Sequence, residues 1–227
     1  MKRNILLLLS LLMATGALAQ NKGYGSLSRG IVIPIGKFAS KDFANRGGAA
    51  KVGSNIDFSF VYGAPDKVGF ALVMRYQTNR TDKEGILESF KKKEPYSRSV
   101  NSDKWNFAIV MLGIRKTYKM NDYLDIEAKF TGGLSRCYLP FVSVREFTEY
   151  YARYMSSATS WATMFGLGAN LVITPNVYVQ TKVDIMATMP RFKDIQLYHE
   201  ELYTPFDEEY HQLILSTSVC IGLGLKF

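Results

Sequence analysis

The chain has 227 residues and a formal net charge of +8, and 47% of its residues are hydrophobic. This length fits one domain. Beyond residue 19 the sequence has no run of about 18 apolar residues, which excludes a membrane-spanning helix in that part of the chain.

The N-terminus has the pattern of an export signal. Lys2 and Arg3 form a basic start, Ile5 to Met13 is almost entirely apolar, and Ala17 and Ala19 supply the small residues that a signal peptidase requires. A membrane anchor is the alternative, but nine residues are too few to cross about 30 Å of hydrocarbon. We therefore expect a Sec-type signal peptide over 1–19, cleavage after Ala19, and one domain over 20–227.

Export changes how the basic balance is interpreted. A positive net charge can indicate nucleic-acid binding, but an exported protein rarely meets nucleic acid. Anionic lipid head groups, including those of lipopolysaccharide, are the expected partners of the positive charge.

Alternating apolar and polar residues predict β-strands along the rest of the chain. The last segment shows the pattern best, with an apolar face that includes Leu213, Leu215 and Val219 and a small or polar face that includes Ser216 and Ser218. Pro34 is expected to end the first strand, and the strand over 104–118 is apolar on both faces. The predicted strands are 23–33, 48–62, 67–78, 104–118, 123–137, 158–173, 177–189 and 211–227.

The connections between these strands alternate in length. Short turns are expected at 63–66, 119–122 and 174–176, and long connections at 34–47, 79–103, 138–157 and 190–210. Short periplasmic turns, longer outer loops and an even number of strands are typical of transmembrane barrels. The sequence therefore predicts an all-β fold, an eight-stranded antiparallel up-and-down transmembrane β-barrel, with both termini of the barrel domain on the periplasmic side.

The polar faces of the strands carry four positive and four negative groups. If these faces pointed to water, the chain would be a secreted lipocalin-like binding barrel. If they point inward, the charges can pair, which makes their burial tolerable, and an eight-stranded lumen is narrow enough for side chains to fill. We therefore expect a plugged lumen with an ion-pair network formed by Lys51, Asp57, Arg75, Asp125, Glu127, Lys129, Lys182 and Asp184.

Aromatic residues lie near the predicted strand ends. Amphipathic rings prefer the two head-group levels of a membrane, where they form girdles around a barrel. The expected girdle residues are Tyr62, Tyr76, Trp105, Tyr118, Tyr123, Trp161, Tyr178 and Phe227.

Two of the long connections could bind partners. Lys91, Lys92 and Lys93 could contact lipopolysaccharide phosphates, or could pair with the acidic stretch 199–211. The connection 138–157 is rich in aromatic residues, which favours either a recognition surface or rings that pack on one another where strands extend beyond the membrane.

The sequence contains no recognisable catalytic or metal-binding pattern. His199, Asp194 and Asp207 share a long connection but lack the spacing of a lipid-modifying barrel enzyme. The acidic residues after His199 lack a calcium-loop motif. Neither Cys137 nor Cys220 has a catalytic setting, and we do not expect them to pair. No cofactor is expected.

Two segments resemble a known group of proteins. Residues 33–38 (IPIGKF) with 47–50 (GGAA), and the final GLGLKF of residues 222–227, resemble the small outer-membrane barrels of the OmpA/OmpX-like and PorT-like outer membrane beta-barrel domain family. The resemblance implies an outer-membrane barrel whose last strand is recognised by the barrel-assembly machinery. Members differ widely in role. We expect a non-enzymatic protein that anchors outer loops for structural work or for an envelope or extracellular partner, with a small diffusion pore or a lipid A-modifying enzyme as alternatives.

Overall fold

The computed structural model describes residues 23–42, 47–63, 68–91, 99–145, 150–153, 155–199 and 202–227. The expected signal peptide, residues 1–19, lies outside this range. In the part of the chain that the structure describes, no helix is long and apolar enough to span a membrane.

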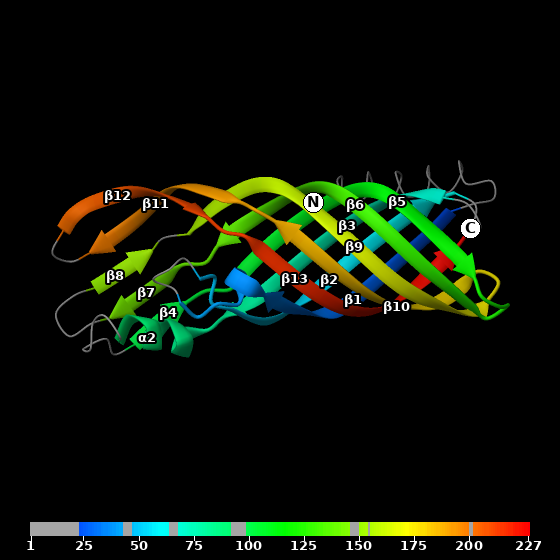
Figure 1. The fold of residues 1–227 in the computed structure, drawn as a ribbon, viewed down its shortest axis with the longest axis horizontal. Coiled ribbons are helices and arrows are strands. Elements are labelled where there is room, and N and C mark those ends of the chain that lie inside the picture. Colours follow the sequence, from blue (N-terminus) through cyan, green and yellow to red (C-terminus); the bar gives the residue numbers. More distant parts are fainter. Residues whose placement is uncertain are drawn as a thin grey trace, which may run out of the picture.

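Eight long strands form a closed antiparallel barrel (Figure 1). Each barrel strand pairs with the next barrel strand along the chain, and the last one also pairs with the first. The predicted up-and-down topology is therefore confirmed. The barrel strands are β1 (Gly23–Ile35), β2 (Ala50–Tyr62), β3 (Val68–Thr81), β5 (Trp105–Lys119), β6 (Leu124–Leu139), β9 (Ser156–Thr174), β10 (Val177–Thr188) and β13 (Ile214–Lys226).

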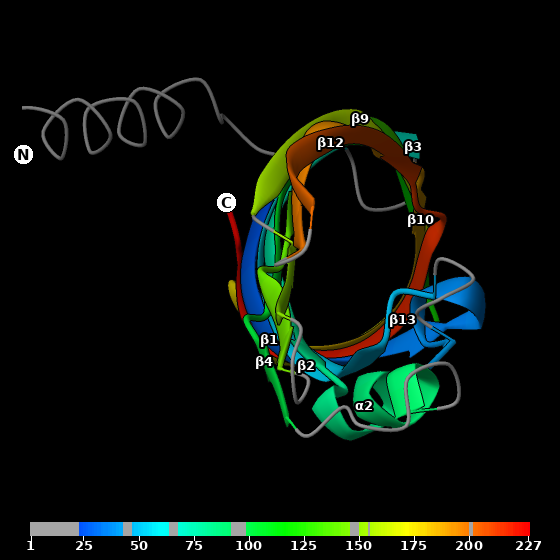
Figure 2. The same cartoon turned by 90° about the vertical axis from the view of Figure 1, so that its left-hand side faces the viewer.

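The seam between β1 and β13 closes the ring that Figure 2 shows end-on. Twelve residue pairs join the two strands, from Tyr24 and Lys226 at one end to Ile35 and Leu215 at the other. Beyond them, Gly23 and Phe227 exchange backbone hydrogen bonds of 2.8 and 3.0 Å. Closure leaves neither strand with a free edge along this seam, which is the condition for a sheet to stand in hydrocarbon.

The outer wall of the barrel is apolar. Every barrel strand has large, exposed hydrophobic side chains at outward positions, among them Phe70, Leu112 and Leu223. Water would oppose such a continuous apolar surface, whereas acyl chains solvate it. The alternation predicted from the sequence is therefore present, with the apolar face outside.

A second sheet continues from the long-connection end of the barrel (Figure 1). Its order is β12-β11-β8-β7-β4, and its strands are β4 (Ser99–Ser102), β7 (Val142–Arg145), β8 (Tyr150–Arg153), β11 (Arg191–His199) and β12 (Leu202–His211). A short helix, α2 (Lys83–Lys91), precedes β4, and a 3-10 turn, η1 (Gly36–Phe38), follows β1.

Three of the expected long connections are therefore not simple loops. The segments 79–103, 138–157 and 190–210 contain α2 and the five strands of the second sheet. Their strands are short or irregularly paired, with register shifts between β11 and β12. Alternation over four residues is too brief to separate a strand from a loop by sequence alone.

The expectation that Pro34 ends the first strand is also wrong, because β1 continues to Ile35. Pairing between β1 and β2 stops at Val32, whereas pairing between β1 and β13 continues through Pro34. Proline has no N–H to donate, so it is tolerated where one side of its strand is unpaired.

Candidate functional site: the filled barrel interior

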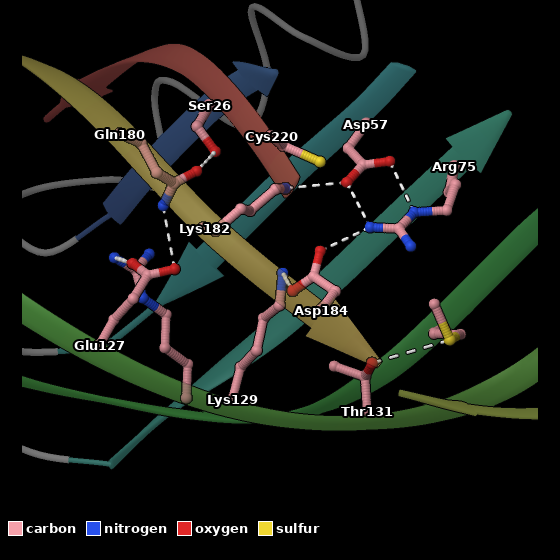
Figure 3. Close-up of polar contacts among 12 residues, drawn as sticks. Ser26, Asp57, Arg75, Glu127, Lys129, Thr131, Gln180, Lys182, Asp184 and Cys220 are labelled. Atoms are coloured by element: carbon pink, nitrogen blue, oxygen red, sulfur yellow. Dashed lines mark hydrogen bonds and ion pairs between the residues drawn. The ribbon is translucent and has the colours of Figure 1, made fainter. Parts of the chain in front are cut away.

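A group of five buried charges occupies the middle of the barrel (Figure 3). Arg75 binds Asp57 through both carboxylate oxygens, at 2.7 Å from Nε and 2.6 Å from Nη2, and its Nη2 also lies 2.5 Å from Asp184 Oδ2. Lys182 Nζ lies 2.9 Å from Asp57 Oδ2, and Lys129 Nζ lies 2.9 Å from Asp184 Oδ1. Each charge therefore has at least one opposite partner.

Strand periodicity turns these five charges inward, and the register of the closed barrel brings them together. They come from β2, β3, β6 and β10, which are separated in sequence, and each occupies an inward position of its strand. Asn55, two residues before Asp57, donates from Nδ2 to Asp57 Oδ1 at 3.1 Å and to Cys220 Sγ at 3.3 Å. Such neutral donors complete the shell that a buried carboxylate requires.

A second polar group lies nearer the short turns. Glu127 forms an ion pair with Arg115 and accepts hydrogen bonds from Gln180 Nε2 at 2.9 Å and Asn170 Nδ2 at 3.0 Å. The Ser26 hydroxyl donates to the side-chain oxygen Oε1 of Gln180 at 3.2 Å. At the barrel end, the side chain of Lys226 lies 2.9 Å from Asp125. The polar contacts thus extend from mid-barrel to the turn end.

The other half of the interior contains the largest apolar cluster of the described residues, with buried polar side chains such as Gln77 and Ser135 beside it. Trp105 and Phe107 stack with a centroid distance of 6.2 Å, and Phe38 of η1 packs edge-on against Trp105 at 5.4 Å. Trp105 donates its indole N–H to the carbonyl of Gly48 at 3.0 Å, which satisfies its polar atom. The buried cluster consists of Phe38, Ala50, Val73, Trp105, Phe107, Ile109, Met111, Cys137, Leu139, Ala158, Ala162, Met164, Met186, Phe192, Tyr210 and Ile214. It lies between the charged groups and the second sheet.

Asp82 connects the barrel rim to α2. Its carboxylate accepts a hydrogen bond from the Gly85 backbone N–H at 3.1 Å and lies 2.8 Å from Lys51 Nζ and 3.6 Å from Lys41 Nζ. Burial raises the pKa of Asp82, but the hydrogen bonds from Lys51 and Gly85 and the two lysine charges outweigh burial and hold it below its ordinary value. Asp82 is thus the N-cap of α2 as well as an ion-pair partner.

The structure places seven of the eight expected lumen charges inside the barrel, and Lys51 outside it. The side chain of Lys51 is 48% exposed and binds Asp82 at the rim, because it is only the second residue of β2 and lies above the network. Sequence reasoning missed Arg115 and Lys226. Arg115 has the same parity as Trp105 and Phe107, a signal obscured because both faces of β5 are largely apolar.

Two of the expected girdle residues face inward, which corrects that part of the prediction. Trp105 lies in the apolar cluster, and Tyr178 packs against Tyr24 with a centroid distance of 6.5 Å. Tyr178 shares the parity of Gln180 and Lys182, so its inward position follows from the same alternation that placed those residues. The six that lie exposed on the outer wall or its rim are Tyr62, Tyr76, Tyr118, Tyr123, Trp161 and Phe227.

The chemistry of the interior argues against a metal site among the residues described. Asp57, Asp184 and Cys220 bring possible ligand atoms within 4.8 Å of one another. However, Arg75 and Lys182 already neutralise these carboxylates, and their positive charges would repel a cation. Cys137 and Cys220 are both buried free thiols. The side chains of His199, Asp194 and Asp207 lie outside the described residues.

Comparison with known proteins finds likeness in fold. No protein-family model and no curated protein matches the chain. A major outer membrane protein from Thermus thermophilus matches with a TM-score of 0.51 and 8% identity, over 90% of this chain and 99% of that one. The outer membrane protease OmpT from Escherichia coli gives 0.51 and 9%, over 91% and 94%. The fold is therefore that of the small outer-membrane β-barrels.

Proposed function

We propose that this protein is a non-enzymatic outer-membrane barrel whose lumen is closed and whose role is to hold the second sheet outside the membrane for binding a partner. The filled interior carries the proposal. Paired charges occupy the middle of the barrel and aromatic rings occupy the end below the second sheet. An ion crossing the lumen would have to break buried ion pairs and then pass through a layer packed with buried, largely apolar side chains.

The second sheet supports the binding part of the proposal. It continues directly from the barrel, since β11 follows β10 and β12 precedes β13. Its outer strands, β4 and β12, each pair on one side within the described residues. A rigid scaffold that positions a variable outer surface is a common arrangement for recognition. In this proposal the lipopolysaccharide of the outer leaflet surrounds the barrel. The last strand, β13, presents the signal that the barrel-assembly machinery recognises.

Single-channel recording tests the closed lumen. We expect the refolded protein in planar bilayers to give no stepwise conductance in 1 M KCl, while a porin added to the same bilayer does. A heat-unfolded sample controls for detergent leakage. Reproducible steps that scale with salt concentration would overturn the proposal in favour of a diffusion pore.

Lipid A analysis tests the absence of enzyme activity. We expect identical lipid A mass spectra from cells that express the protein and cells that lack it. The loss or gain of an acyl chain that depends on the protein would instead establish a lipid-modifying enzyme.

Deletion of residues 143–153, joined by a short Gly-Ser linker, tests the binding surface. We expect the variant barrel to fold and to lose adhesion of cells to matrix or host-cell surfaces. A matched variant with a linker replacing only the short turn 120–122 at the opposite end should adhere like the parent protein. Equal adhesion of both variants, or no adhesion by the parent protein, would contradict the proposed role.

A further inference from the structure

Arg29 is a charged residue on the lipid-facing wall, midway along β1. It is the seventh of the thirteen residues of Gly23–Ile35, and its side chain is exposed. Its cross-strand partners are Ile56 on β2 and Ile221 on β13, both exposed apolar residues of the same wall. A charge at the bilayer centre is rare, costly and usually functional.

The other outward charges of the described barrel strands lie near strand ends. Lys116 and Arg136 are each the fourth residue from the end of their strand, and each lies over a tyrosine ring, at 4.9 Å from the Tyr118 centroid and 5.6 Å from the Tyr138 centroid. Those positions allow a long side chain to reach the head groups. All acidic side chains of the described barrel strands point inward, so the wall itself offers Arg29 no counter-ion.

An apolar groove of about 570 Å³ begins at Leu27, two residues before Arg29, and extends toward the short turns. Leu27, two positions before Arg29 on the same face, pairs with Phe58 and Leu223, and all three line the groove. Gly25 leaves the groove open because it has no side chain on this face. At the turn end the groove is bounded by Phe227, which stacks on Phe60 with centroids 5.9 Å apart.

The groove and the arginine together specify the occupant. A symmetric dimer through this face would set Arg29 against Arg29 of the second copy, and a convex barrel would not enter a groove. A linear acyl chain fits the groove, and a carboxylate at its end forms a charge-assisted, bidentate pair with a guanidinium. We propose that this face of the barrel binds a free long-chain fatty acid, with its carboxylate on Arg29 and its chain in the groove along β1 and β13.

The test uses the full mature protein refolded in neutral detergent, with radiolabelled palmitate as the probe. We expect saturable binding to one site per barrel. Palmitate methyl ester, which has the chain without the charge, should bind about tenfold more weakly or worse, as expected for loss of a charged hydrogen bond. The ester comparison needs no mutation and therefore cannot be confused with misfolding.

Two variants and two matched controls test the site. Arg29→Leu should weaken palmitate binding about tenfold while leaving ester binding unchanged, whereas Gly25→Leu should weaken both by filling the groove. Arg136→Leu removes another outward arginine, and Gly132→Leu fills an outward glycine on β6 whose added carbon would meet nothing nearer than 3.8 Å. Both controls should bind palmitate like the parent protein.

The proposal rests on the membrane placement proposed above. Heat-dependent mobility in SDS tests the barrel fold independently of fatty-acid binding. Equal affinity of the folded protein for palmitate and its ester would overturn the fatty-acid site. Unchanged palmitate binding in Arg29→Leu or in Gly25→Leu would overturn it as well, even if the barrel is closed and resides in the outer membrane.

Discussion

At the scale of single residues, the face of the strand decides what a charge costs. Asp57 and Arg29 occupy neighbouring strands near the middle of the barrel, but Asp57 points inward to two cations and Arg29 points outward to isoleucines. Burial of a charge is tolerated when its partners are fixed in place and expensive when they are absent. The same wall therefore contains one charge with fixed partners and one charge without a partner in the wall.

Replacing Asp57 by Ala should destabilise the barrel by about 3–5 kcal/mol, because removal of one partner leaves buried charges uncompensated. Lys182 loses the carboxylate at 2.9 Å, while Arg75 keeps only Asp184. Urea unfolding from lipid vesicles, followed by tryptophan fluorescence, measures the change. Lys51→Ala is the control, since that ion pair is half-exposed and solvent screening leaves it a much smaller contribution. Equal losses in the two variants would show that the interior pairs are energetically no different from rim pairs.

Replacing Arg29 by Leu should change the stability of the barrel in the opposite direction. In vesicles free of fatty acid, removal of an outward arginine at mid-membrane should stabilise the barrel by about 2–4 kcal/mol. The same unfolding assay applies, and Arg136→Leu, close to the outer interface, should change stability by about 1 kcal/mol or less. A destabilised Arg29→Leu protein would mean that the arginine has a stabilising partner within the bilayer.

At the scale of elements, α2 and its cap fasten the first outer connection to the barrel rim. The Asp82 N–H donates to the carbonyl of Ala49 at 2.7 Å, while its carboxylate receives the Gly85 N–H and binds Lys51. Ile86 of α2 is fully buried, in a cluster with Ala49 and with Val142 and Val144 of β7. Asp82 thus links β2 to α2, and Ile86 links α2 to the second sheet.

Asp82→Ala should loosen this connection without unfolding the barrel. Loss of a helix cap costs about 0.5–2 kcal/mol, and we expect faster hydrogen exchange over residues 83–91 with unchanged exchange in β10. Glu88→Ala, on the same helix but remote from the cap, should leave exchange nearly unchanged. Protection that is equal in all three proteins would contradict a capping role.

Acid should have a related effect in the parent protein. Because the folded pKa of Asp82 is lowered, its contribution is fully present above the ordinary aspartate pKa of about 3.9 and is lost as the pH falls from there through the folded value. Exchange in α2 should therefore accelerate on acidification below about pH 4, and this acceleration should be smaller in Asp82→Ala.

At the scale of the whole molecule, the barrel and the second sheet should be separable. Neighbouring barrel strands pair along almost their full length, and the barrel interior contains its own packed groups. We expect a variant in which residues 194–207 are replaced by a short turn to keep its heat-dependent mobility in SDS, because the pairing of β10 with β13 remains. Loss of that mobility shift would show that the outer sheet is needed for barrel folding.

Much of the fold could be predicted from alternation. Residues such as Leu223 and Ser218 on β13, or Lys182 and Val183 on β10, sort by parity, and parity alone assigns a face. The same alternation predicted the inward charges of the barrel wherever apolar and polar residues clearly alternate along a strand. Arg115 escaped because the neighbouring residues on both faces of β5 are largely apolar, and Trp105 and Tyr178 were assigned by residue type when their parity indicated the inside.

The sequence by itself determined the eight barrel strands and which face of each is apolar, because a period of two is a local property that needs no partner. Only the tertiary structure decided which charges meet, that aromatic rings rather than ions fill one half of the lumen, and that three long connections combine into a second sheet. Those outcomes depend on the register around a closed ring, which brings Asp57, Arg75 and Asp184 together across 128 residues of chain, and no local pattern encodes that register.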